Sequence, residues 1–164
     1  MVTTAASREQ ILGWLGEIVD PEIPVLSLTD LGIVRDVEVG DAVTVSLTPT
    51  YSGCPATEVI EQSVVDTLHE RGIENVAIKR VLSPAWTTDW ITSQGRDKLR
   101  EYGIAPPEEG GASKRELLFG KRVIPCPRCD SRNTSGVSEF GSTACKASYK
   151  CDDCLEPFEY FKCI

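Results

Sequence analysis

Apolar residues recur every three or four positions in three segments of the chain, which is the spacing of amphipathic helices. The three segments are residues 7–19, 55–71 and 88–102. Ser7 and Gln10 form a capping-box pattern at the start of the first segment. Gly72 and Gly103 stand directly after the other two, where glycine commonly ends a helix. The pattern therefore predicts three helices.

A second pattern, in which apolar and polar residues alternate, predicts strands between these helices. The strands are expected at residues 33–39, 42–48 and 76–82. Gly40-Asp41 suits a two-residue turn, so the first two strands should form a hairpin. We expect residues 1–104 to form a small α+β domain with three helices and a three-stranded sheet.

Residues 105–120 follow neither pattern and begin with prolines, glutamates and glycines, which predicts a linker. The remaining residues, 121–164, contain six of the seven cysteines and short strand-like runs. Two CxxC pairs, Cys126-Pro-Arg-Cys129 and Cys151-Asp-Asp-Cys154, are separated by 21 residues. This arrangement is near the spacing of two-knuckle zinc sites and predicts a β-rich zinc ribbon.

Four thiolates can surround a tetrahedral zinc ion at about 2.3 Å, and in so small a unit the metal supplies folding energy. We therefore expect one structural zinc ion per chain, with four ligands: Cys126, Cys129, Cys151 and Cys154. Two alternatives stay open, a redox dithiol and a tetrahedral iron site, because thiolates also bind iron.

Cys145 and Cys163 raise the number of cysteines in the tail to six for four ligand places. Each could be a small buried residue, since free cysteine often behaves as a hydrophobic side chain. The other interpretation makes either one a substitute ligand or a thiol that contacts transferred metal. The sequence does not choose between them.

Cys54 lies between the end of a predicted strand and Pro55. Proline favours the first helical position, so Cys54 is expected at or near the helix cap. There the helix dipole and free backbone N–H groups would stabilise a thiolate, which can bind iron or attack an electrophile. The alternative is a cysteine that packs under the helix.

Other polar and aromatic candidates have structural explanations. Three carboxylates follow the first helix closely: Asp20, Glu22 and Asp30. Turn-rich loops use Asp for backbone hydrogen bonds, which we favour over an acid–base or metal cluster. His69, the one histidine, lies off the apolar stripe of its helix, so a Cys–His hydrolase is not expected. Trp86 and Trp90 could equally belong to the core or face a partner.

The charge distribution argues against several classes of partner. The net charge is −8; residues 1–120 hold 19 acidic and 10 basic residues, and residues 121–164 hold 6 and 7. Nucleic acids are bound by clustered Lys and Arg, so a non-specific nucleic-acid binder is not expected. The chain shows neither a membrane-length apolar run nor a signal-peptide pattern. We expect a cytosolic protein whose cysteines bind metal rather than form disulfides.

Two groups of motifs resemble known families. Asp20-Pro-Glu-Ile-Pro, Asp30-Leu-Gly-Ile-Val and Thr50-Tyr-Ser-Gly-Cys-Pro resemble the domain of metal–sulfur cluster biosynthesis and cytosolic iron–sulfur assembly proteins. Pro84-Ala-Trp-Thr-Thr-Asp-Trp and the cysteine-rich tail resemble the PaaD, or PaaJ, family of phenylacetate-degradation proteins, from the phenylacetyl-CoA epoxidase system. The second resemblance spans nearly the whole chain.

The resemblance implies a compact α+β fold, a zinc-binding tail and an accessory role for a ring-epoxidising di-iron monooxygenase. Cys54 matches the body cysteine of the family, and the two CxxC pairs match its tail knuckles. The chain itself is not expected to be an enzyme, because it has neither paired Glu-x-x-His motifs nor a flavin or nicotinamide fingerprint. The expected partners are the oxygenase or iron–sulfur reductase subunits, and a homodimer is also expected weakly.

Our main hypothesis is that Cys54, together with Cys145, transiently holds iron or an iron–sulfur cluster while the ribbon docks a client subunit. The main alternative is a non-catalytic clamp that holds the monooxygenase subunits together through its ribbon. A thiol–disulfide catalyst is a weaker alternative, since it would need an exposed CxxC pair that is not saturated by metal.

Overall fold

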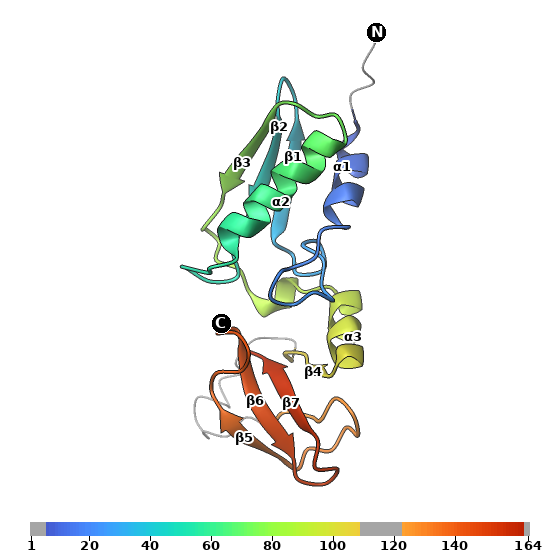
Figure 1. Ribbon diagram of the computed structural model, residues 1–164, viewed down its shortest axis with the longest axis vertical. Coiled ribbons are helices and arrows are strands. Elements are labelled where there is room, and N and C mark those ends of the chain that lie inside the picture. The colour runs from blue at the N-terminus through green and yellow to red at the C-terminus, as the bar shows by residue number, and fades with distance from the viewer. Residues whose placement is uncertain (1–5, 109–122, 163–164) are drawn as a thin grey trace. The chain divides into compact units, whose positions relative to one another are not determined.

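The computed structural model describes residues 6–108 and 123–162 of the chain (Figure 1). The chain divides into two compact units, Met1–Trp86 and Thr87–Ile164, which we call unit 1 and unit 2. Helices and strands occur in both, so the predicted α+β class is confirmed. The expected domain limits at residues 104 and 120 remain predictions, and the second of them lies outside the described residues.

Unit 1 is a three-stranded sheet with two helices. Its sheet has the order β1-β2-β3, with β1 and β2 antiparallel and β2 and β3 parallel. Helix α2 connects the two parallel strands, as a parallel pair requires a crossover. Helix α1 contacts β1 and α2 contacts β3, and the two helices contact each other (Figure 1). The elements are α1 (Arg8–Leu15), β1 (Val34–Val39), β2 (Val43–Leu47), α2 (Thr57–Glu70) and β3 (Val76–Arg80).

Helix α1 begins as predicted and ends earlier. Ser7 Oγ accepts the backbone N–H of Gln10, and Gln10 Oε1 accepts that of Ser7, which completes the capping box. The helix ends at Leu15, four residues before the predicted end, although Ile18 continues its apolar spacing. The carbonyl of Ile18 instead accepts the backbone N–H of Leu28, because the chain folds back on itself here.

Trp86 belongs to the core of unit 1. Its side chain is buried, and its Nε1–H donates to the carbonyl of Leu31 at 2.7 Å. The loop that contains Leu31 contributes several fully buried side chains to the same core, which explains how a long irregular segment stays ordered. These fully buried residues are Ile11, Leu15, Leu26, Leu28, Leu31, Val37, Val45, Val64 and Leu68.

Unit 2 is built on a four-stranded sheet of order β4-β7-β6-β5. Three neighbouring strands, β5, β6 and β7, are antiparallel, and β4 joins β7 in parallel. The predicted third helix is shorter at its start, because Thr92 rather than a residue before Thr88 accepts the capping bond, from the N–H of Gly95. The elements are η1 (Thr88–Trp90), α3 (Ser93–Tyr102), β4 (Ile104–Ala105), β5 (Thr134–Ser138), β6 (Lys146–Cys151) and β7 (Pro157–Phe161).

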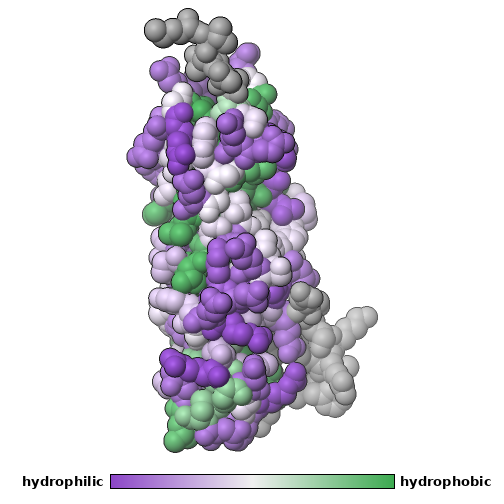
Figure 2. All heavy atoms as spheres, turned by 90° about the vertical axis from the view of Figure 1, so that its right-hand side faces the viewer, coloured by the Kyte–Doolittle hydropathy of each residue, from purple (hydrophilic) through white to green (hydrophobic). Residues whose placement is uncertain are grey.

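Hydrophilic residues cover most of the face shown in Figure 2, and hydrophobic residues occupy small separate areas. In unit 2 the most exposed large apolar side chains are those of Val137, Phe140 and Leu155. Within the described parts of the chain, no helix has both the length and the apolar character that a membrane crossing needs.

Candidate metal centre

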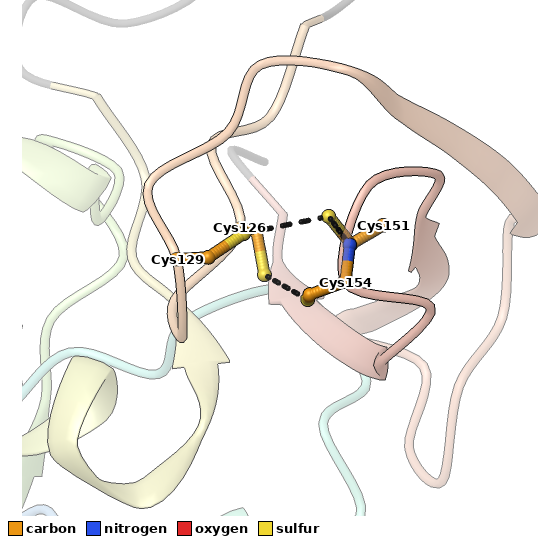
Figure 3. Close-up of side chains that lie close together, drawn as sticks. All are labelled: Cys126, Cys129, Cys151 and Cys154. Atoms are coloured by element: carbon orange, nitrogen blue, oxygen red, sulfur yellow. Dashed lines mark hydrogen bonds between the residues drawn. The ribbon is translucent and has the colours of Figure 1, made fainter.

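The four cysteines of the two CxxC pairs come together at one end of the unit 2 sheet. Their sulfur atoms all lie within 4.8 Å of one another, and Figure 3 shows the side chains directed toward a common centre. The sulfurs of Cys126 and Cys154 are 3.8 Å apart, and those of Cys129 and Cys151 are 3.6 Å apart. A tetrahedral ion at about 2.3 Å from each sulfur places the sulfurs about 3.8 Å apart, so the arrangement fits a tetrahedral thiolate metal site.

Each pair lies in a turn of the same construction. We call residues 126–131 knuckle 1 and residues 151–156 knuckle 2. The backbone N–H of Cys126 donates to the carbonyl of Ser131, and that of Cys151 donates to the carbonyl of Glu156, both at 2.9 Å. The residue after the second cysteine has a left-handed backbone in both turns, with φ of 58° at Asp130 and 64° at Leu155. Two copies of one turn thus present four sulfurs to one centre.

Within each knuckle the first cysteine is buried and the second is exposed. Cys126 and Cys151 belong to a cluster of buried side chains on one face of the sheet, with Ala105, Ile124, Ala147, Phe158 and Tyr160. The ring of Tyr149 stacks on Phe158, with ring centres 5.9 Å apart. The cluster anchors one sulfur of each knuckle, while the other faces solvent.

Backbone amides and neighbouring thiols set the acidity of the sulfurs. The backbone N–H groups of Cys154, at 3.4 Å, and of Asp153 lower the pKa of the Cys151 thiol to about 7. The backbone N–H of Ser131 acts in the same direction on Cys129, but burial and the adjacent thiols outweigh it and raise the pKa of Cys129 to about 12. A cation that binds four thiolates must therefore displace protons, as thiolate metal sites do.

Cys145 does not belong to the four-sulfur group. It lies directly before β6, is buried, and has its sulfur 3.1 Å from Thr143 Oγ1. Its carbonyl accepts the backbone N–H of Lys162, which ties the turn before β6 to the residue after β7. Cys163, the other extra cysteine, lies outside the described residues.

Cys54 is half-buried in the turn between β2 and α2 of unit 1. Helix α2 begins at Thr57 with Ala56 as its N-cap, so Cys54 lies two residues before the cap. Its N–H donates to the carbonyl of Tyr51 at 3.3 Å and its carbonyl accepts the N–H of Thr57 at 3.2 Å. In the described residues, the four knuckle cysteines form the one group of three or more side chains able to hold a metal, and Cys54 is not in it.

The carboxylates that follow helix α1 hold backbone rather than a ligand. Asp20 Oδ1 accepts the N–H groups of Glu22 and Ile23, both at 2.8 Å, and Asp30 Oδ2 accepts that of Ser27 at 3.1 Å. These bonds are those expected of Asp in turns. His69 is exposed near the end of α2.

One residue of the metal centre, Asp153, was not predicted from the sequence. Its carboxylate lies between two ligand cysteines and accepts hydrogen bonds from Ser131 and Asn133. The signal was present in the sequence, because two acidic residues inside a thiolate site repel the thiolates unless other groups hydrogen-bond to them.

Two family models match separate parts of the chain. A model described as "Iron-sulfur cluster assembly protein" matches residues 8–79, and one described as "PaaD zinc beta ribbon domain" matches residues 110–162. The first match lies in unit 1, and the second contains all four knuckle cysteines.

Known proteins resemble the whole chain or its first part. An Escherichia coli (strain K12) protein, whose name provisionally assigns it to 1,2-phenylacetyl-CoA epoxidase as one of the subunits, is 51% identical over 156 residues, 94% of this chain and 92% of its own length. An Fe-S protein maturation auxiliary factor of Porphyromonas gingivalis is 34% identical over 96 residues, 57% of this chain and 90% of its own. A Bacillus anthracis structure titled as a domain of unknown function, DUF59, shares the fold with a TM-score of 0.53 and 22% identity, over 56% of this chain and 90% of that one.

Proposed function

Because the chain belongs to the PaaD family, we propose that it is an accessory subunit of a multicomponent 1,2-phenylacetyl-CoA epoxidase, a di-iron monooxygenase. In this proposal it performs no chemistry on the substrate and supports other subunits in the cytosol. The observation that carries it is the presence, in one chain, of an iron–sulfur assembly module and a four-thiol metal centre. A relative of similar length that is named as an epoxidase subunit supplies the client.

The metal of the knuckles is, in this proposal, one structural zinc ion. The donor set is four sulfurs at tetrahedral spacing, and zinc has no geometric preference that would oppose it. The metal would fix both knuckles against the sheet of unit 2, whose buried cluster is small. Its contribution is therefore to folding and to the shape of the ribbon surface.

The finer part of the proposal concerns iron. Cys54 lies half-exposed in a turn, where a thiolate can reach a metal carried by another protein. Unit 1 also resembles proteins named as Fe-S protein maturation auxiliary factors. We infer that Cys54 holds iron or a cluster transiently, with the client supplying the other ligands. A contribution from Cys145 is kept as part of this inference.

A second function, a clamp that holds epoxidase subunits together, has an observation in its favour. Among the described residues, Cys54 has no companions that would make a metal site of three or more ligands. A protein that carries iron on its own needs such companions, whereas a clamp does not.

The test is the metal and acid-labile sulfide content of the full chain purified without oxygen. Wild type is compared with Cys54→Ser and Cys151→Ser, and Cys145→Ser serves as the matched control for loss of a buried thiol. We expect about one zinc per chain, lost in Cys151→Ser alone, and iron or sulfide that is lost in Cys54→Ser.

The same variants, expressed with the epoxidase subunits, separate the two functions. Loss of iron from the client with Cys54→Ser supports maturation. A client that keeps full metal content and activity with Cys54→Ser, but separates from the other subunits with Cys151→Ser, favours the clamp.

A further inference from the structure

The two knuckles are joined by hydrogen bonds that involve no sulfur. Asp153, in knuckle 2, accepts the hydroxyl of Ser131, in knuckle 1, on Oδ2. Its Oδ1 accepts the side-chain amide of Asn133 at 2.8 Å. Both oxygens of this carboxylate are thus occupied by donors from the opposite turn and the residues just after it. We call this set the Asp153 bridge.

The ends of the bridge also direct backbone amides at sulfur atoms. The backbone N–H of Ser131 is hydrogen-bonded to the sulfur of Cys129, and that of Asp153 to the sulfur of Cys151. Those two sulfurs are 3.6 Å apart across the centre. A bond between the side chains of Ser131 and Asp153 therefore fixes the two amides, and the amides fix two ligands that belong to different knuckles.

Asp152, the neighbour of Asp153 in the same CxxC pair, is arranged differently. Its carboxylate accepts the hydroxyl of Ser135 at 3.2 Å, on β5 and outside both knuckles. It has the same charge and the same distance in sequence from a ligand cysteine. Asp152 is therefore a matched control for the charge of Asp153 without the bridge.

We propose that Asp153 is a positioning residue of the metal centre, whose bridge to Ser131 and Asn133 holds the knuckles at the separation that four-sulfur binding requires. The proposal rests on the proposed function, in which the four cysteines hold a resident metal. Groups that orient metal ligands without touching the metal commonly change affinity about 10- to 100-fold when removed. We expect a loss of this size for Asp153→Ala.

The experiment measures binding of Zn²⁺ and Co²⁺ to the metal-free full chain by competition with a chromophoric chelator. Wild type is compared with Asp153→Ala, Asp152→Ala and Asp153→Asn, and the ligand-field absorption of the bound Co²⁺ is recorded for each. An asparagine at 153 can accept from Asn133 and donate to the oxygen of Ser131, so it should retain most of the affinity. The absorption reports ligand geometry, which a general loss of stability does not change.

We expect Asp153→Ala to bind about 10- to 100-fold more weakly than wild type and to shift the Co²⁺ absorption, while Asp152→Ala matches wild type. Equal affinity and equal spectra for Asp153→Ala and Asp152→Ala would overturn the proposal. Wild type that binds neither ion would instead refute the metal site itself. Should Asp153→Ala fail to fold, Asn133→Ala must still bind more weakly than Asp152→Ala, and equality there would also overturn the proposal.

Discussion

Asp130 and Leu155 occupy the same place in the two knuckles, one residue after the exposed cysteine, and both have a left-handed backbone. Asp adopts this conformation with little cost because its short side chain bonds locally, whereas for most residues it costs roughly 1–2 kcal/mol. Leu155 is also 64% exposed. Knuckle 2 therefore carries backbone strain that knuckle 1 avoids.

The first prediction is that Leu155→Asn stabilises the metal-loaded chain by about 1 kcal/mol, because asparagine tolerates the left-handed conformation. The measurement is the free energy of unfolding from denaturant titration at constant metal. Leu155→Ala is the control, since it removes the same apolar side chain but keeps a residue that disfavours this backbone. If alanine stabilises as much as asparagine, exposure rather than strain is the cause.

The second prediction concerns Thr48, whose hydroxyl is buried and has no hydrogen-bond partner among the described residues. Valine has nearly the same shape and lacks the hydroxyl, so Thr48→Val should stabilise unit 1 by about 1 kcal/mol. The midpoint of thermal unfolding measures the effect. Thr48→Ser keeps the hydroxyl and should not stabilise; a less stable valine variant would mean that the hydroxyl is bonded in solution.

The third prediction concerns Gly141, which lies against Glu159. A Cβ atom at position 141 would lie 2.5 Å from Glu159 Oε1. That carboxylate accepts the N–H of Ser142 at 2.6 Å and lies 3.3 Å from the nitrogen of the buried Lys146. Gly141→Ala should therefore destabilise unit 2 by about 1–3 kcal/mol, the usual cost of overpacking.

The control for this substitution is Gly40→Ala, in the hairpin of unit 1. The nearest atom to a Cβ there is the carbonyl oxygen of Ala42, at 3.9 Å. Gly40→Ala should change the free energy of unfolding by less than about 0.5 kcal/mol. Equal effects of the two substitutions would show that Glu159 moves aside without cost.

The fourth prediction is that a chelator unfolds the ribbon and leaves unit 1 folded. The knuckle sulfurs are the described link between the two turns at the end of the sheet, apart from a few exposed polar bonds such as the ion pair of Arg128 and Glu156. Amide hydrogen exchange of the full chain, with and without chelator, would show faster exchange in β5, β6 and β7 only. Protection that persists in these strands would contradict a structural metal.

Ligand spacing made the metal centre predictable, because two CxxC pairs state the ligands directly in the sequence. The Asp153 bridge was not predictable in the same way. It depends on the pairing of β5 with β6, where Thr134 lies opposite Cys151 and the carbonyl of Asn133 accepts the N–H of Asp152. That register brings Asn133 and Asp153, 20 positions apart, together, and no local pattern encodes it.

The helices were predictable in their centres and less so at their ends. Ile60, Val64 and Leu68 have helical spacing and are buried on one face of α2 as expected. The expected start at Pro55 is two residues early, because Pro55 and Ala56 form a turn that precedes the helix. This difference moved Cys54 away from the cap, and so the helix-end argument for its acidity does not apply.

Strand β4 pairs in parallel with β7, which places Ile104 opposite Glu159. During synthesis this pairing can form only when the last strand has left the ribosome, whereas every strand of the first sheet precedes residue 81. Domains that emerge first generally fold first. Unit 1, with Cys54, would then be complete while the second pair of metal ligands is still being made, so the assembly module matures before the ribbon.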